Sequence, residues 1–343
     1  MANFDYLMTT RRVSGGAFEA KAGPVRYLRV PSDAADATPA NQADSVSKWV
    51  DEVTAIADAN VNQHSISPTG DLLVFVHGYN NDLKTALWRQ RRLAADLEAA
   101  EWHGLVIGFD WPSGDSTLAY LEDRSRAAEV ALELVRKCVL IIVQGQKANC
   151  LTNIHILGHS TGAYVIMEAF AQAEKVGKFF KDDWRIGQVA FISGDVSSSS
   201  LSQTDDWGKP MFSRIMRLTN YSNGCDAVLG VSNAKRLGAA PRAGRVGLPA
   251  DANAKAVNVD CTDYFKTKDA AAAVFAPDSN YTHSWQIGDP VFTLDLALTL
   301  EGAIDRNKLP TRRVQDGQLV LQPGKRPDYQ SVQVTKPPMR ETA

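Results

Sequence analysis

The chain has 343 residues, of which 44% are hydrophobic and 22% charged, and its formal net charge is -2. This is the composition of a soluble globular protein, and the balanced charge excludes a broad electrostatic attraction to nucleic acid or anionic membranes. The apolar run at residues 139–143 is far shorter than the roughly 18 residues of a membrane span, and residues 1–16 contain no apolar signal core. We therefore expect a cytoplasmic protein without a membrane span and without a nucleic-acid partner.

The first 63 residues carry weak structural signals. A strand is expected at residues 25–30, and a helix after Ser45 or Ser47, either of which is a suitable cap. We predict that residues 1–63 form an extension packed on a larger core. The four cysteines show neither close pairing nor metal-type spacing, so we interpret them as free thiols and expect no metal and no cofactor.

Buried strands and amphipathic helices then alternate. Continuous apolar runs predict strands at residues 72–76, 104–109, 154–157, 188–192, 214–219 and 256–259. Apolar residues at helical spacing predict helices at 83–97, 118–143, 163–173 and 290–300. This alternation indicates an α/β core over residues 64–304, with a mostly parallel central sheet and helices on both faces.

Three segments are expected at the surface. Residues 238–252 are rich in Gly, Ala, Arg and Pro, which is typical of a surface loop. Residues 305–343 are polar and are predicted to form a small hairpin around Asp316-Gly317 and then a tail. The cluster Arg89, Arg91 and Arg92 is interpreted as the solvated face of a helix.

The strongest motif is Gly158-His159-Ser160-Thr161-Gly162, between a predicted buried strand and an apolar helix. The pattern Gly-x-Ser-x-Gly suits a sharp strand-to-helix turn that holds the serine in a strained conformation with its oxygen exposed. The helix N-terminus directs amide donors toward an oxyanion formed there. We predict that Ser160 is a nucleophile; the alternative is a structural tight turn.

A second motif, His77-Gly78-Tyr79-Asn80, follows the strand at residues 72–76. A loop at this place can bring a backbone amide to a tetrahedral intermediate. The N–H groups of Tyr79 and Thr161 are the candidate oxyanion donors. For His77 itself, a hydrogen-bonded structural role is favoured over proton transfer.

A serine nucleophile needs a base, and in folds with this elbow the order along the chain is Ser, then Asp or Glu, then His. Of the six histidines only His283 follows Ser160, so it is the candidate base. The acid must lie between the two, after a sheet strand. Asp226 is preferred, Asp195 is the alternative and Asp260 is the outsider. The acid would hold the histidine tautomer and stabilise the imidazolium.

At these residues the chain resembles a family of bacterial α/β-hydrolases catalogued as being of unknown function. The resemblance rests on the elbow, on the His77-Gly78-Tyr79-Asn80-Asn81 loop, and on several further motifs along the chain. These are Trp111-Pro112-Ser113 with Tyr120 and Asp123, Tyr221-Ser222-Asn223-Gly224-Cys225-Asp226-Ala227 with Ser232, Arg236-Leu237-Gly238, and His283-Ser284. The resemblance implies the α/β-hydrolase fold and a triad of Ser160, Asp226 and His283, but little about the substrate.

Together these features predict a serine hydrolase that cleaves carboxylic esters through an acyl-enzyme. Residues 196–213 are too short and polar for a large lid, so we expect a small or absent lid and small to medium acyl groups. Trp111 and His159 are candidate substrate contacts, and for Trp111 a packing role is equally open. The alternatives are an acyltransferase or thioesterase with the same triad, or a binding protein without catalysis. Oligomeric state is not indicated by the sequence.

Overall fold

A computed structural model describes residues 4–59, 70–113, 120–145, 152–181, 184–234, 240–268 and 281–328. Of residues 120–124, 145, 233 and 234 it describes the backbone alone. Cys150, one of the four cysteines, and the motif Arg236-Leu237-Gly238 therefore lie outside the described part, as do the side chains of Tyr120 and Asp123.

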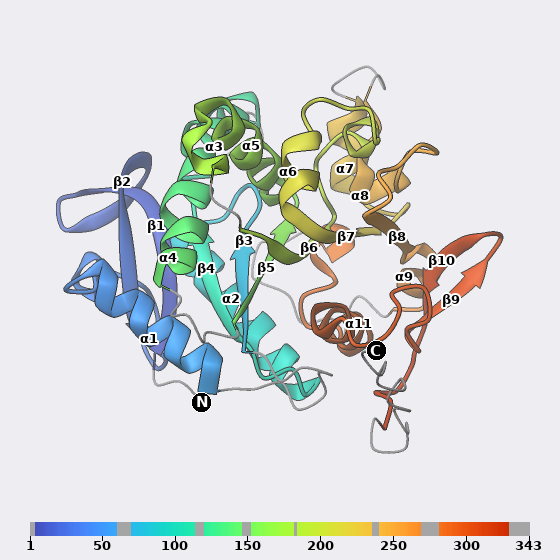
Figure 1. Cartoon of the computed structure of the whole chain (residues 1–343), viewed down its shortest axis with the longest axis horizontal. Coiled ribbons are helices and arrows are strands. Elements are labelled where there is room, and N and C mark those ends of the chain that lie inside the picture. Colours follow the sequence, from blue (N-terminus) through green and yellow to red (C-terminus); the bar gives the residue numbers. More distant parts are fainter. Residues whose placement is uncertain are drawn as a thin grey trace, which may run out of the picture.

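A central sheet of ten strands organises the described residues. The strands are β1 (Phe4–Ser14), β2 (Ala17–Pro31), β3 (Asp71–Val76), β4 (Leu105–Asp110), β5 (Asn153–His159), β6 (Ile186–Ile192), β7 (Ile215–Ser222), β8 (Ala256–Asp260), β9 (Arg312–Gln315) and β10 (Gln318–Leu321). Their order in the sheet is β2-β1-β4-β3-β5-β6-β7-β8-β10-β9. All neighbours are parallel except β1 with β2 and β10 with β9, which pair antiparallel at the two edges (Figure 1).

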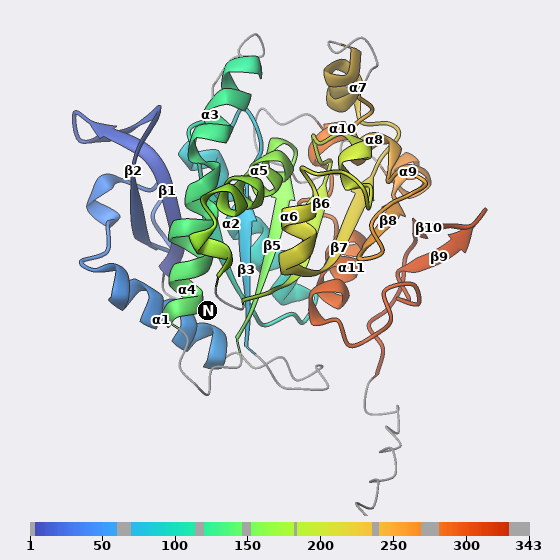
Figure 2. The ribbon, with the colours of Figure 1, turned by 45° about the horizontal axis from the view of Figure 1, so that its top comes forward.

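Helices cover both faces of this sheet, as predicted. They are α1 (Val46–Ala59), α2 (Leu83–Ala99), α3 (Tyr120–Glu133), a π-helical turn (Leu134–Val139), α4 (Leu140–Gly145), α5 (Thr161–Val176), α6 (Lys209–Arg214), α7 (Ala227–Ala234), α8 (Ala243–Val246), α9 (Thr262–Lys266), α10 (Tyr281–Ser284) and α11 (Pro290–Glu301). Figure 2 shows α3, α4 and α5 crossing one face. Among the described helices none is long and apolar enough to cross a membrane.

The core lies in two layers, one on each side of the sheet. In β3 the side chains alternate, so that Leu72, Val74 and Val76 pack with α1, α3, α4, α5 and α6, whereas Leu73 and Phe75 pack with α2 and α11. From Leu72 to Val76 this strand is buried on both faces, which explains why its sequence there is a continuous apolar run.

Polar residues at the helix ends explain where several helices begin. The Ser45 hydroxyl accepts a hydrogen bond from the Lys48 N–H at 3.1 Å, so Ser45, of the two candidates, caps α1. Asp82 caps α2 by accepting from Thr85 N–H at 2.7 Å. The Asp289 carboxylate accepts from the first turn of α11, which Pro290 opens.

The amino-terminal strand β1 was not expected from the sequence. Residues 4–14 include Arg11, which a half-buried strand would ordinarily keep in solvent. In the structure β1 pairs parallel with β4, and Arg11 is 4% exposed because it meets the buried Asp110. Only this distant partner makes an arginine compatible with the strand interior.

The prediction of a surface loop at residues 238–252 is wrong for its middle part. Arg242 and Ala243 are buried, and Ala243 opens the short helix α8. The Gly244 N–H donates to the Gly194 carbonyl at 3.0 Å, which ties this segment to the end of β6. The segment therefore packs against the carboxyl edge of the sheet.

Farther along, β9 and β10 form a hairpin beside β8. Its turn residues Asp316 and Gly317 both have positive φ, 51° and 78°, as a two-residue hairpin turn of the primed type requires. Arg326 then pairs with Glu301 at the end of α11, at 2.7 Å. Residues up to 328 thus pack against the core.

Candidate active site

The motif around Ser160 forms the turn between β5 and α5. Ser160 has φ 56° and ψ -122°. A residue other than glycine keeps this backbone conformation only when the surrounding structure constrains it. Neighbouring backbone holds it: the Ser160 N–H donates to the Ile192 carbonyl, and its own carbonyl accepts from Asp195 N–H, both at 3.0 Å. A Cβ at Gly162 would lie 2.2 Å from the Val76 carbonyl oxygen. The helix can therefore begin this close to β3 only with glycine at that position.

His283 and Asp226 meet beside this turn. The His283 Nδ1 lies 2.7 Å from Oδ2 of Asp226, and both side chains are buried. Because a carboxylate only accepts, the proton between these two atoms lies on Nδ1, and in the neutral ring Nε2 is the nitrogen with the free lone pair. The His283 ring lies 5.0 Å from the ring of His159, the residue before Ser160. The pair is therefore adjacent to the strand-to-helix turn.

Two elements keep this carboxylate and this ring in place. The second oxygen of Asp226 accepts from the Leu229 N–H at 2.9 Å, so Asp226 also caps the first turn of α7. The Asn223 amide donates to the Thr282 carbonyl at 3.2 Å, which ties the end of β7 to the residue before His283. Through these contacts, backbone groups next to Asp226 and next to His283 help to hold the two side chains in their orientation.

The two other aspartates considered from the sequence have different partners. Oδ1 of Asp195 lies 3.3 Å from Nε of the buried Arg242. The Ser232 hydroxyl donates to the same oxygen at 3.1 Å. Asp260 accepts from the N–H of Thr262 at 2.8 Å, at the start of α9. Of the three, Asp226 contacts His283.

The loop after β3 lies against the serine. A Cβ at Gly78 would lie 2.6 Å from Cβ of Ser160, so this backbone approaches the turn as closely as a glycine allows. The Asn81 amide donates to the carbonyls of Gly78 and Tyr79, at 2.9 and 2.8 Å. These bonds fix the loop that carries the Tyr79 N–H. The other expected donor, Thr161 N–H, belongs to the first residue of α5, where amides have no acceptor within the helix.

A buried ion pair lies behind that loop. Nε of Arg11 lies 2.9 Å from Oδ2 of Asp110, and Nε2 of His77 lies 3.0 Å from Oδ1. Burial by itself would raise the pKa of Asp110, but the Arg11 charge and the His77 ring outweigh it and lower the pKa below the ordinary value. His77 therefore has a hydrogen-bonded position at the end of β3, with its Nδ1 2.8 Å from the Gly78 carbonyl.

Trp111 and His159, the candidate substrate contacts, are both buried and hydrogen-bonded to neighbouring loops. Trp111 is fully buried, stacks on His77 with ring centroids 5.5 Å apart, and donates from its indole to the His77 carbonyl at 2.8 Å. His159 is 2% exposed, and its ring nitrogens face Arg89 and the His283 carbonyl. Both residues thus brace the surrounding loops.

The interpretation of the arginine cluster as a solvated face is wrong for two of its members. Arg89 is 5% exposed and points to His159. Arg91 is half-buried and pairs with Asp5 at 2.7 Å. Arg92 pairs with Asp96 at the surface of α2. Arg89 and Arg92 are three residues apart and therefore lie on the same side of the helix, so the spacing gave no signal that Arg89 is buried and Arg92 is not.

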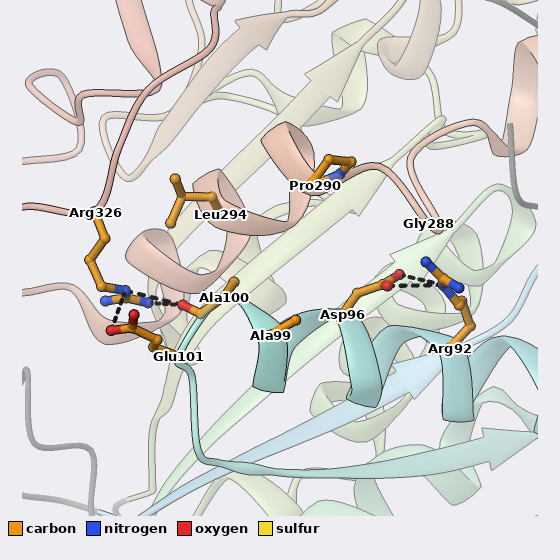
Figure 3. Close-up of a pocket in the computed structure, with 9 residues that line it drawn as sticks. All are labelled: Arg92, Asp96, Ala99, Ala100, Glu101, Gly288, Pro290, Leu294 and Arg326. Atoms are coloured by element: carbon orange, nitrogen blue, oxygen red, sulfur yellow. Dashed lines mark hydrogen bonds and ion pairs between the residues drawn. The ribbon is translucent and has the colours of Figure 1, made fainter. Parts of the chain in front are cut away.

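The described residues line two cavities that do not include the Ser160 turn. One, of about 560 Å³, lies between α2, α11 and Arg326 (Figure 3). The other, of about 600 Å³, is lined by Trp102, Gly104 and residues of β1 and α2. Ser160, Asp226 and His283 line neither cavity. Both reach the C-terminal end of α2, which lies at the amino edge of the sheet, opposite the edge that carries Ser160.

The described residues contain no group of three or more His, Cys, Asp or Glu side chains suited to a metal ion. Cys138 and Cys261 are buried free thiols, and Cys225 is a half-buried one.

Comparison with known proteins identifies a family. Residues 54–270 match the model of the family described as alpha/beta hydrolase of unknown function (DUF900). The match covers more than half of the chain and includes Ser160 and Asp226. No curated protein matches the sequence.

The solved structures that match the chain share little sequence with it. A carboxyl esterase from Tuber melanosporum is 12% identical, with a TM-score of 0.37 over 89% of each chain. A metagenomic carboxyl esterase is 16% identical, with a TM-score of 0.36 over 69% of this chain and 76% of the other. A putative hydrolase from Agrobacterium vitis is 16% identical, with a TM-score of 0.30 over 55% and 78%. The chain belongs to the DUF900 family of α/β-hydrolases.

Proposed function

For this α/β-hydrolase we propose the activity of a serine hydrolase that cleaves carboxylic esters through an acyl-enzyme on Ser160. The observation that carries the proposal is the Asp226–His283 contact of 2.7 Å beside the strained Ser160 turn. A base oriented by a buried carboxylate and a serine held in a strained strand-to-helix turn are the two parts that serine acyl transfer needs.

In the first half-reaction the Ser160 hydroxyl oxygen attacks the ester carbonyl carbon, and Nε2 of His283 takes the hydroxyl proton. Asp226 holds the Nδ1–H tautomer and stabilises the imidazolium. The N–H groups of Tyr79 and Thr161 donate to the carbonyl oxygen as it becomes an oxyanion. His283 then gives its proton to the alcohol oxygen, the carbon–oxygen bond breaks, and the alcohol leaves the acyl-enzyme.

In the second half-reaction water takes the place of the alcohol. His283 removes a proton from the water, whose oxygen attacks the acyl carbon. The tetrahedral intermediate collapses, the proton returns to the Ser160 oxygen, and the carboxylic acid is released.

The segment between β6 and β7 supports small to medium acyl groups as substrates. Its apolar side chains, among them Val196, Leu201, Met211 and Phe212, are buried in the domain core. They already pack against other core side chains, so a long acyl chain would gain little further apolar contact from them.

The test is hydrolysis of a series of p-nitrophenyl esters, from acetate to palmitate, by the wild type and by Ser160→Ala. We expect the substitution to lower kcat by roughly 10⁴-fold or more, as loss of a triad nucleophile does. A fluorophosphonate probe should label the wild type and the control Ser199→Ala, whose serine is exposed in the β6–β7 segment. Labelling that persists in Ser160→Ala would contradict the proposal.

A further inference from the structure

Arg89 lies inside the protein next to the residue that precedes the nucleophile. It projects from α2, is 5% exposed, and places Nη1 3.2 Å from Nδ1 of His159. Its Nη2 lies 3.4 Å from the Ser284 hydroxyl, one residue after His283. Burial lowers the pKa of Arg89 to about 10, so the guanidinium stays charged at neutral pH.

These contacts define the protonation of His159. A guanidinium can only donate, so Nδ1 of His159 must accept and carries no proton. Nε2 lies 3.1 Å from the His283 carbonyl oxygen, which can only accept, so Nε2 must carry the proton. Arg89 and the His283 backbone together therefore select one neutral tautomer of the ring.

The surroundings of His159 favour the same state. The titratable groups that face it are Arg89 from α2, His283 from α10 and His77 from the end of β3. Burial first, and the charge of Arg89 second, lower the pKa of His159 well below its ordinary value. The ring thus has no role as a proton carrier near neutral pH.

We propose that Arg89 and His159 are positioning residues for the base: Arg89 holds His159 in its Nε2–H tautomer, and His159 in turn fixes the backbone of His283. The proposal rests on the proposed function of His283. With the opposite tautomer a lone pair of Nε2 would face the His283 carbonyl oxygen. The resulting repulsion would shift the short helix α10 and with it the imidazole. A displacement of about 1 Å in such a group can cost 10²-fold in rate.

Kinetics of Arg89 variants test the first part of the proposal, the action of Arg89 on His159. Arg89→Met should lower kcat by about 10- to 100-fold with KM changed by less than about threefold, because the base is displaced and the ester-binding surface is not. Arg89→Lys keeps an obligate donor and should recover part of the loss. Arg92→Met, on the same helix but at the surface, is the matched control and should match the wild type in both constants.

Variants of His159 test the second part of the proposal, the action of His159 on the backbone of His283. Gln at position 159 can donate an amide proton to the His283 carbonyl, whereas Phe fills the space without donating. We expect His159→Gln to retain most of the wild-type kcat and His159→Phe to fall to the level of Arg89→Met. The two His159 variants also test the proposal if Arg89→Met does not fold.

A spectroscopic measurement decides the tautomer without reference to activity. In protein labelled with ¹⁵N-histidine, the His159 signals, assigned with His159→Gln, should show a neutral ring protonated at Nε2 from mildly acidic to mildly basic pH. In Arg89→Met they should show both tautomers. Protonation at Nδ1 in the wild type would overturn the proposal, as would a folded Arg89→Met with kcat within about twofold of wild type.

Failure of the proposed function has a different signature. The wild type would then hydrolyse no ester and would not react with the fluorophosphonate probe. In that outcome the Nε2–H tautomer and its loss in Arg89→Met would still support the action of Arg89 on His159. A tautomer unchanged in Arg89→Met would overturn it.

Discussion

Arg11 of β1 and Asp110 at the end of β4 form a buried ion pair, with Nε of Arg11 2.9 Å from Oδ2 of Asp110. The same guanidinium donates to the carbonyls of Asn81 and Trp111, at 2.8 and 3.0 Å. One side chain of the amino-terminal strand thus connects the loop after β3, which packs against the Ser160 turn, with the loop after β4. The amino-terminal hairpin is therefore tied to the loops that support the candidate site.

Loss of this arginine should destabilise the fold. Arg11→Met leaves Asp110 as a buried charge without its main partner, which typically costs about 3–5 kcal/mol. The next residue is the matched control: Arg12 pairs with Glu19 at the surface, and such exposed pairs contribute about 0–1 kcal/mol. Urea unfolding of both variants gives the comparison. Equal midpoints for Arg11→Met and Arg12→Met would contradict the assignment of the buried pair.

The same pair predicts a pH dependence of stability. The pKa of Asp110 is lower in the folded protein than in the unfolded chain, where it is about 3.9. Its contribution is therefore fully present above about pH 3.9 and is lost as the pH falls through the lower folded value. The difference in unfolding free energy between wild type and Asp110→Asn should be constant from neutral pH down to that point and then shrink. A difference that grows on acidification would show the opposite sign of the pKa shift.

The two aspartates near the end of the sheet should respond differently to amidation. Asp226→Asn should lower kcat by roughly 10²- to 10⁴-fold while the protein stays folded, because the amide no longer selects the Nδ1–H tautomer of His283. Asp195→Asn should act mainly on stability, since it leaves the buried Arg242 without its ion-pair partner. The measurements are kcat on one activated ester and the thermal midpoint of each variant. Reversed effects would assign the acid to Asp195.

The base should be visible in the pH dependence of the rate. A general base must be neutral to take the Ser160 proton, so kcat/KM of the wild type should have an ascending limb on the acid side of its pH profile. His283→Ala should lose this ascending limb together with most of the rate. His159→Gln should keep the limb, because that ring does not carry the proton. If His283→Ala retained both the rate and the ascending limb, His283 would not be the base, and His77 would be the next candidate.

The sequence by itself determined the features that depend on near neighbours. The apolar run of β3 indicated a strand buried on both faces. Asp289-Pro290 predicted the start of α11, and Asp316-Gly317 predicted the turn between β9 and β10. The Gly-x-Ser-x-Gly spacing likewise predicted the strand-to-helix turn at Ser160. A Cβ at Gly158 would meet Ala163 of the following helix, whereas the crowding at Gly162 comes from the distant Val76 of β3.

Only the tertiary structure decided which distant side chains meet. Asp226 and Asp195 both follow sheet strands, and the position of α10 decides that Asp226 contacts His283. Arg89 was interpreted as a surface charge, and no strand was expected at Arg11. Helix packing and strand pairing brought His159 and Asp110 to these two arginines. A buried charge is stable only beside a suitable partner, and that partner is set by the register of elements far apart in the chain.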